Sequence, residues 1–328
     1  MKRLYIFFFL VLMPGIFCLT AVKAGENLIP ESISGGIGPM AEIAQLTPPI
    51  GGTSPPGQEG APGNSYSKAD WLKRTTIGAI LESDQKPRYY IETVQPFYQS
   101  AGKKHTVFTH IRISGQDDYG TYSAGVGYRR LLFNNSLMAW INTFFDYQDP
   151  HQHYRQGVGL EAIGTSAELR ANGYFGLSPA RKVAEPGTYE KARDGFDVEL
   201  GVPVPYLPWM KVFGSLYWYD FKEGPDVEGW KGRAQLKPLD FLTINLETYD
   251  DNKGSQEWRS DVRLTLWVDS FAPKDILAAL TSSFRETLPE VDMKERTLDR
   301  VERNFQITVE KWSDGGGTGG FSVQVGRT

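Results

Sequence analysis

Apolar and polar residues alternate one by one in the segments between Tyr119 and Ser178. Successive side chains of a β-strand point to opposite faces, so such a segment has one apolar and one polar side. In the first segment the apolar positions are Tyr122, Ala124, Val126 and Tyr128, and the positions between them are Ser123, Gly125, Gly127 and Arg129. The pattern predicts strands whose polar side carries full charges and bare glycine.

The same alternation predicts twelve strands, at residues 75–82, 87–99, 105–114, 119–132, 136–147, 154–164, 166–178, 194–204, 210–221, 228–239, 242–250 and 257–268. The connections between the later strands are of two alternating kinds. Tight turns fall at residues 133–135, 165, 205–208 and 238–240, and longer hydrophilic loops at residues 148–153, 179–193, 222–227 and 251–256. A meander with short turns at one end and long loops at the other is typical of a bacterial outer-membrane barrel.

A soluble β-sandwich shows a similar alternation and is the competing fold. The apolar side here includes many Ala, Gly, Tyr and Trp residues, and aromatic residues gather near strand ends, at Phe144, Phe145 and Tyr147 and at Tyr217, Trp218 and Tyr219. Such clusters suit the interfacial girdles of a membrane barrel. Closure of the sheet would also pair every backbone group in lipid. We therefore expect an all-β fold, a closed antiparallel transmembrane β-barrel of twelve strands at residues 71–270.

The chain changes character after the last predicted strand. Residues 273–280 read as a short helix with a proline in its first turn. Residues 295–303 are too charged to face lipid, and residues 304–312 alternate as an extended segment does. We expect residues 271–312 to comprise this helix and a linker that returns outward through the lumen, followed by a short Gly-rich tail at 313–328.

The N-terminal part consists of an export segment followed by a linker. Residues 1–24 have a charged start, an apolar run and a small-residue exit, which predicts a secretory signal peptide; an uncleaved anchor helix is the alternative. Residues 25–70 form a Pro/Gly-rich periplasmic linker that lacks an apolar period and is expected to be disordered. A polyproline-type ligand in this linker is the weaker reading.

The composition argues against several classes of function. The net charge of −4 argues against a nucleic-acid partner. The only cysteine is Cys18, which would leave with the signal peptide, so neither a disulfide framework nor a cysteine-based metal site or nucleophile is expected. The chain also has no G-x-S-x-G elbow, and we expect neither an enzyme nor a cofactor.

The charges on the polar side of the strands are the main functional candidates. The lumen-facing set is Glu161, Glu168, Arg170, Asp197, Glu199, Lys231, Arg233, Glu247, Asp261 and Arg263. Mixed signs at this density permit cross-strand pairs, each worth about 0.2–1 kcal/mol. These residues could also hold the linker through Arg296, Asp299, Arg300, Glu302 and Arg303. Generic polarity of the lumen, without a specific partner, is the alternative.

Three smaller motifs have plain structural readings. The run Gly157-Val-Gly-Leu-Glu-Ala162 matches a dinucleotide pattern, but strand alternation runs through it, so the glycines are expected to leave lumen space for neighbouring side chains. His151 and His153 lack a clear third and fourth metal ligand and are predicted to lie in a solvated loop. His110 is expected to make a hydrogen bond in the lumen.

Six blocks follow one another along the predicted barrel and the segment after it: the run from Tyr122 to Met138, Asn142-Thr-Phe-Phe-Asp-Tyr147, Arg155-Gln-Gly-Val-Gly-Leu-Glu161, the run from Leu169 to Ser178, Asp194-Gly-Phe-Asp-Val-Glu-Leu200 and Arg296-Thr-Leu-Asp-Arg-Val-Glu-Arg-Asn304. In this order they resemble the translocator β-barrel of the inverse autotransporters, the intimin and invasin family. The resemblance implies a twelve-stranded outer-membrane barrel with a periplasmic N-terminus. It also implies a linker that threads the pore and displays C-terminal immunoglobulin-like domains on the cell surface.

We expect this sequence to depart from the family at both ends, with a Pro/Gly-rich linker in place of a LysM-like module before the barrel and no passenger after Trp312. We expect an outer-membrane barrel that anchors and exports its own C-terminal segment. The alternatives are a small-solute pore and a stand-alone barrel that pairs with a separately encoded surface protein. The expected partners are outer-membrane lipid, lipopolysaccharide and the barrel assembly machinery.

Overall fold

The computed structural model describes residues 70–183, 187–254, 256–266 and 292–313. The expected signal peptide, Pro/Gly-rich linker, helix at 273–280 and Gly-rich tail lie outside these residues, apart from the single positions 70 and 313. Among the described residues, no helix has both the length and the apolar character that a membrane crossing requires.

Twelve long strands form the barrel: β1 (Thr75–Glu82), β2 (Arg88–Gln99), β3 (His105–Gln116), β4 (Tyr119–Leu132), β5 (Leu137–Asp149), β6 (His153–Gly164), β7 (Glu168–Gly176), β10 (Gly195–Val204), β11 (Leu207–Tyr219), β12 (Val227–Leu239), β13 (Leu242–Asp251) and β14 (Glu257–Thr265). Three short strands, β8 (Arg181–Lys182), β9 (Thr188–Ala192) and β15 (Val309–Ser313), form a separate sheet. The short 3₁₀ helices are η1 (Leu72–Arg74), η2 (Ala101–Lys103) and η4 (Glu295–Leu298).

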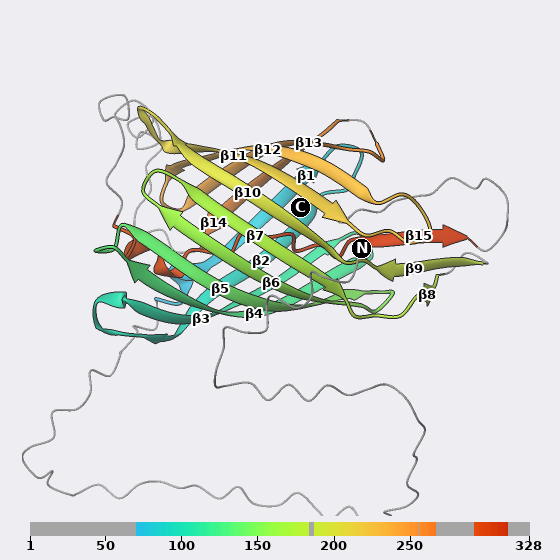
Figure 1. Ribbon diagram of the computed structural model, residues 1–328, viewed down its shortest axis with the longest axis horizontal. Coiled ribbons are helices and arrows are strands. Elements are labelled where there is room, and N and C mark those ends of the chain that lie inside the picture. Colours follow the sequence, from blue (N-terminus) through green and yellow to red (C-terminus); the bar gives the residue numbers. More distant parts are fainter. Residues whose placement is uncertain (1–69, 184–186, 255, 267–291, 314–328) are drawn as a thin grey trace, which may run out of the picture. The chain divides into compact units, whose positions relative to one another are not determined.

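The long strands pair antiparallel in the order β1-β14-β13-β12-β11-β10-β7-β6-β5-β4-β3-β2 and close on themselves (Figure 1). The closing pair joins β1 to β14, with Thr76 opposite Thr265 and Glu82 opposite Arg259. Closure leaves no unpaired strand edge, as a hydrocarbon surrounding requires. The predicted all-β, closed twelve-stranded barrel is confirmed.

The two faces of the wall follow the alternation in the sequence. On β6, Val158 and Leu160 are exposed on the outside, whereas Arg155 and Glu161 are buried inside. The outer face is apolar and the inner face charged, which is the reverse of a soluble sandwich with its apolar face inward. The alternative of a sandwich is therefore wrong.

The two rims of the barrel differ in their connections. One, called the turn rim, has the connections 100–104, 133–136, 165–167, 205–206 and 240–241. The other, called the loop rim, has the connections 83–87, 117–118, 150–152, 177–194, 220–226 and 252–256. At the turn rim, Phe133, Asn134 and Asn135 all have positive φ, and asparagine tolerates that conformation better than most residues. The loop expected at 148–153 is shorter than predicted, because β5 continues to Asp149 and β6 begins at His153.

The chain's own residues 292–309, the lumen linker, pass through the lumen (Figure 1). Near the turn rim Met293 packs with Leu131 and Trp140, and in the middle Phe305 packs with Phe108 and Phe144. At the loop rim Ile307 and Val309 pack with Ala192. The lumen linker therefore runs from one rim to the other.

Two details of the sequence prediction are wrong here. Phe144 and Tyr219 are buried inside the barrel, and Tyr217 lines the lumen cavity, so none of the three belongs to an outer girdle. Phe144 lies over Gly125 of β4, where a Cβ would overlap its ring, so the bare glycine makes room for an inward aromatic residue. The segment expected to be extended at 304–312 forms a strand only from Val309, where β9 supplies hydrogen-bond partners.

Candidate functional site

The centre of the site is a guanidinium of the linker that is held by a carboxylate of the wall. Arg303 donates two hydrogen bonds to Asp146 on β5, at 2.9 and 2.8 Å. Both side chains are almost fully buried, and the guanidinium carbon lies 4.4 Å from the ring centre of Phe144. Such a bidentate pair fixes orientation as well as charge.

Gly157 on β6 leaves the space that this guanidinium occupies. A Cβ built on Gly157 would overlap the end of the Arg303 side chain. Gly159 stands in the same relation to Asn142 and Asn172. The expectation that these glycines leave lumen space is confirmed, and the dinucleotide reading fails because the whole motif lies within one strand.

The wall also holds the backbone of the linker, which has no neighbouring strand until Val309. Arg155 bonds Asp146 at 2.9 Å and donates to the carbonyl oxygens of Asn304 and Gln306, both at 2.6 Å. The backbone N–H of Asn304 donates to the hydroxyl of Tyr174 at 2.7 Å. Buried backbone groups need partners, and here side chains of the wall supply them.

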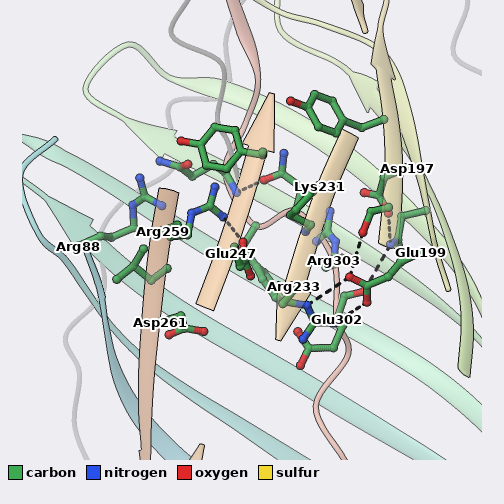
Figure 2. Close-up of a pocket in the computed structure, with 18 of the residues that line it drawn as sticks. Arg88, Asp197, Glu199, Lys231, Arg233, Glu247, Arg259, Asp261, Glu302 and Arg303 are labelled. Atoms are coloured by element: carbon green, nitrogen blue, oxygen red, sulfur yellow. Dashed lines mark hydrogen bonds and ion pairs between the residues drawn. The ribbon is translucent and has the colours of Figure 1, made fainter. Parts of the chain in front are cut away.

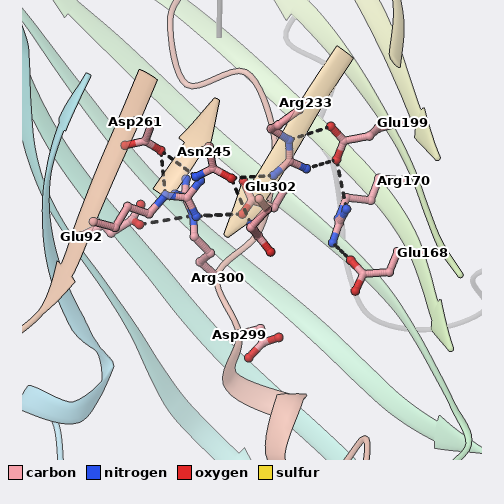
Figure 3. A network of polar contacts seen from close by, with 12 residues as sticks. Glu92, Glu168, Arg170, Glu199, Arg233, Asn245, Asp261, Asp299, Arg300 and Glu302 are labelled. Carbon is pink, nitrogen blue, oxygen red and sulfur yellow. Dashed lines mark hydrogen bonds and ion pairs between the residues drawn. The ribbon is translucent and has the colours of Figure 1, made fainter. Parts of the chain in front are cut away.

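One ionic network joins β6, β7, β10, β11 and β12 to the linker, and Figure 3 shows its part on β7, β10 and β12. Arg170 bonds Glu161 and Glu199 at 3.0 Å each and also contacts Glu168. Arg296 of the linker reaches Glu168 at 2.7 Å, and Lys211 reaches the same carboxylate at 2.6 Å. Glu199 receives a second guanidinium, that of Arg233.

A second network lies on the opposite part of the wall. Arg263 bonds Asp261 at 2.7 Å and Glu302 of the linker at 3.0 Å. Arg300 of the linker lies 3.2 Å from Glu92, between that carboxylate and Glu302 (Figure 3). The linker therefore forms ion pairs with two opposite parts of the barrel wall.

The predicted lumen residues differ in what they contact. Glu168 and Arg263 contact the linker directly, and Glu161, Arg170, Glu199, Arg233 and Asp261 belong to the same networks. Glu247 instead pairs with Arg259 on the neighbouring strand at 3.3 Å. Asp197 accepts from Asn172 and Tyr174, and Lys231 lines a cavity. Of the predicted linker residues, Asp299 bonds only within the linker, to Arg296 at 2.8 Å, among the contacts of the described residues.

Among the residues that sequence reasoning missed are Glu92, Asp146, Arg155 and Tyr174 on the wall of the barrel. Each occupies an inward position of its strand, and the alternation that selected Glu161 on β6 also places Arg155 inward. The available signal was therefore the strand period. The pairing with the linker carries no local signal, since Asp146 and Arg303 are 157 positions apart.

A cavity of about 90 Å³ remains beside the linker, lined by residues of β1–β3, β7 and β10–β14 (Figure 2). Charged side chains line it, among them Arg88, Lys231, Arg259 and Glu302. A liquid water occupies about 30 Å³, so the cavity has room for a few waters. It is far smaller than an aqueous channel.

The linker is also held where it leaves the lumen. Glu310 on β15 accepts hydrogen bonds from the backbone N–H groups of residues 222, 223 and 224, at 3.0, 2.8 and 3.0 Å. Its carboxylate also pairs with Arg193. Trp312 stacks on Tyr189, with ring centres 5.9 Å apart. β15, called the exit strand, thus joins two loops of the loop rim.

The histidines lie in two places. His110 is fully buried and its Nε2 lies 3.4 Å from Glu92, as the expected lumen hydrogen bond requires. His153 begins β6 and is buried, so the solvated loop predicted for it is wrong, whereas His151 lies in the connection 150–152 and is partly exposed, as predicted. The long loop folds back and brings Oε2 of Glu190 to 2.7 Å from His151 and 3.3 Å from His153. Burial acts to raise the pKa of Glu190, but hydrogen bonds with His153 and His151 outweigh it and the pKa lies below its ordinary value.

The closed barrel, its apolar outer face and its occupied charged lumen define an outer-membrane β-barrel protein with an internal linker. The family model "Inverse autotransporter, beta-domain" matches residues 64–304. The chain belongs to this family, and its barrel is a translocator-type domain of the bacterial outer membrane. The family resemblance seen in the sequence is confirmed.

Three curated proteins are similar in sequence to this chain. The chain is 31% identical to Invasin of Yersinia enterocolitica over 264 residues, which cover 73% of this chain and 29% of that protein. It is 30% identical over 138 residues to a "Putative attaching and effacing protein homolog" of Escherichia coli strain K12, covering 42% of this chain and 45% of the relative. It is 26% identical over 262 residues to the Inverse autotransporter adhesin YeeJ of the same strain, covering 75% of this chain and 11% of YeeJ. The chain spans less than half the length of each relative.

A solved structure supports the fold. It comes from work on in-meso crystallization of membrane proteins and matches with a TM-score of 0.60 and 18% identity, covering 73% of this chain and 100% of that one. At this identity the likeness concerns the fold alone.

Proposed function

We propose that the barrel anchors and exports its own C-terminal segment and then keeps the lumen linker locked in place as a plug. The observation that carries the proposal is the linker's course from the turn rim to the loop rim, bonded along its length. The pair of Arg303 and Asp146 is the most buried of the ion pairs between linker and wall described above, with two hydrogen bonds at 2.9 and 2.8 Å. In this proposal the turn rim faces the periplasm and the loop rim faces the outside of the cell.

The charge arrangement favours a plug over an open pore. Four ionised side chains of the linker, Arg296, Arg300, Glu302 and Arg303, pair with charges of the wall, so the linker would leave the lumen only by breaking all of these pairs together. The cavity of about 90 Å³ beside the linker is well below the volume of about 300–1,000 Å³ that is usual for ligand pockets. Both observations support an anchor.

The remaining parts complete the proposal. Residues 1–24 would direct export, residues 25–70 would lie in the periplasm, and the helix at residues 273–280 would precede the linker. Lipid, lipopolysaccharide and the barrel assembly machinery would be the partners of the outer face. The names invasin and adhesin describe much longer relatives. The part matched here would anchor any surface segment that follows it, and this role involves no catalytic step.

Single-channel conductance in planar lipid bilayers tests the plug. The full chain is compared with a variant that ends at Val268. We expect the full chain to be nearly closed and the shortened barrel to conduct strongly, since only the charged lumen wall remains. Equal currents from the two would reject the plug and favour a small-solute pore with a mobile linker.

A second experiment tests the direction. An epitope joined after Thr328 should be stained by antibody on intact cells, whereas an epitope inserted after Gly63 should be stained only after the outer membrane is permeabilised. The opposite pattern would show that the loop rim faces the periplasm and would refute the proposed display of the C-terminal segment.

A further inference from the structure

Two imidazoles and one carboxylate converge at the loop rim, away from the ionic networks of the lumen. His151 lies between β5 and β6, His153 begins β6, and Glu190 is the middle residue of β9. The same oxygen of Glu190, Oε2, lies 2.7 Å from Nδ1 of His151 and 3.3 Å from Nε2 of His153. The candidate ligand atoms of all three residues lie within 4.8 Å of one another. Anchoring and export of the linker do not use this cluster.

The spacing suits a small transition-metal ion. Zinc binds imidazole nitrogen and carboxylate oxygen at about 2.0–2.2 Å, and a tetrahedral arrangement at that bond length separates the ligand atoms by about 3.4 Å. The separations of 2.7 and 3.3 Å reach that value with small side-chain rotations. Imidazole ligands favour zinc, copper or nickel over the hard cations magnesium and calcium. A fourth position would be open to water.

The surroundings of the cluster support ligand roles. His153 is 2% exposed and Glu190 is 3% exposed, so two of the three ligands are held in fixed places. The other ring nitrogen of His153, Nδ1, lies 3.4 Å from the hydroxyl of Ser178. Metal-bound histidines commonly use their second nitrogen in such a hydrogen bond, which fixes the tautomer and the ring orientation.

The position of the cluster links it to the exit of the linker. Glu190 lies on β9, which pairs with β15 so that Tyr189 is opposite Trp312 and Glu190 is opposite Lys311. The two histidines belong to the barrel wall beside β5 and β6. An ion bound by all three residues would therefore tie the wall to the strand that holds the exit strand.

We propose that His151, His153 and Glu190 form a binding site for a zinc-class divalent ion that fixes the exit strand β15 at the loop rim. The site is independent of the direction of export, because ion binding is measured on the folded barrel. A hydrogen-bonded triad without metal affinity is the competing reading.

Isothermal titration of the purified, chelator-treated full chain in detergent tests the site, with ZnCl2 as the probe and MgCl2 for comparison. We expect one zinc per chain and no magnesium binding. His153→Ala, and separately His151→Ala, should weaken zinc binding by at least about tenfold. His105→Ala is the matched control, because His105 bonds Tyr128 at the other rim, and it should bind zinc as the unaltered chain does.

A second readout concerns the exit strand and checks folding. Heat-shifted migration in gel electrophoresis shows whether each variant still forms a barrel. In folded protein, zinc should slow hydrogen exchange at the amides of residues 309–313, and this effect should vanish in Glu190→Gln. Absence of stoichiometric zinc binding by the unaltered chain, or unchanged affinity in both folded histidine variants, would overturn the site. Zinc binding without slower exchange would overturn the role in fixing β15.

Discussion

A single buried carboxylate serves two guanidinium groups in the middle of the lumen. Asp146 accepts from Arg155 on its own sheet and from Arg303 of the linker. Arg155 in turn holds two backbone carbonyl oxygens of the linker. Charge, orientation and backbone satisfaction therefore depend on one residue, and a change there should affect both the fold and the plug.

Replacing Asp146 with Asn should leave two buried guanidinium groups without their shared anion. Breaking such a pair costs about 3–5 kcal/mol, and we expect a loss of that order in the free energy of unfolding, measured by urea titration in phospholipid vesicles. The control is Asp117→Asn, which breaks the solvent-exposed pair with Lys86 and should leave stability unchanged. Similar stability of the two variants would contradict this account of the lumen.

Replacing Gly157 with Ala tests the space beside Arg303. The added methyl group overlaps the guanidinium, which cannot shift without loosening its bonds to Asp146. Overpacking typically costs about 1–3 kcal/mol, and we expect brief openings in single-channel records. Gly173→Ala is the matched control on the adjacent strand, where a Cβ would meet only an ordinary contact with Val158 at 3.5 Å. Openings in both variants, or in neither, would show that the glycine has no special role.

The exit strand is the element that couples the linker to the loops. Glu310 closes the connection between β11 and β12 through three backbone N–H groups and pairs with Arg193 of the long loop. β15 would otherwise be an isolated five-residue strand with a single partner, β9. Its order should therefore depend on this carboxylate.

Replacing Glu310 with Gln should loosen β15 without unfolding the barrel. The amide keeps one acceptor oxygen but loses the charge, so the pair with Arg193 and part of the backbone cap disappear. We expect faster hydrogen exchange at residues 309–313 and unchanged exchange in β4 and β5. Glu223→Gln, an exposed side chain in the same connection, should change nothing. Uniformly faster exchange across the barrel would mean instead that Glu310 supports the whole fold.

The sequence pattern predicted the elements well because a strand's period is local. β1, β4 and β12 have almost the predicted bounds, and the inward positions of Glu161 and Arg170 follow from alternation alone. The pattern could not tell what those inward positions meet. Phe144 was misplaced because its partner Phe305 lies far along the chain, in the linker.

The sequence did not predict the histidine cluster, again because one of its members lies far along the chain. His151 and His153 are two positions apart and visible in the sequence, but Glu190 is 37 positions beyond His153 and arrives through the fold of a long loop. The short sheet of β8, β9 and β15 is also non-local, since β15 pairs with a loop strand that precedes it by more than a hundred residues. Long-range pairing is set by the whole structure, so it leaves no trace in a short window of sequence.

At the scale of the whole molecule, the barrel separates two solvents. Apolar side chains such as Val158 and Leu169 cover the outside, and the charges are sequestered inside with a linker that carries complementary charges. This division lets a chain with an ordinary fraction of charged residues, 23%, lie in lipid. It also means that the cost of a charge should depend on the face and on the depth at which it stands.

Replacing Val158 with Arg places a charge on the outer face near the middle of β6, where the side chain is 43% exposed to the surroundings of the barrel. A cation at the centre of the lipid-facing band costs about 2–4 kcal/mol, falling to about 0–1 kcal/mol near the interface. We therefore expect a lower free energy of unfolding in phospholipid vesicles for Val158→Arg and little change for Leu177→Arg, an outward residue just beyond β7 at the loop rim. In detergent micelles, which adapt around a charge, the difference between the two should shrink. Equal losses at both positions in vesicles would show that the outer face does not meet a hydrocarbon layer of defined depth.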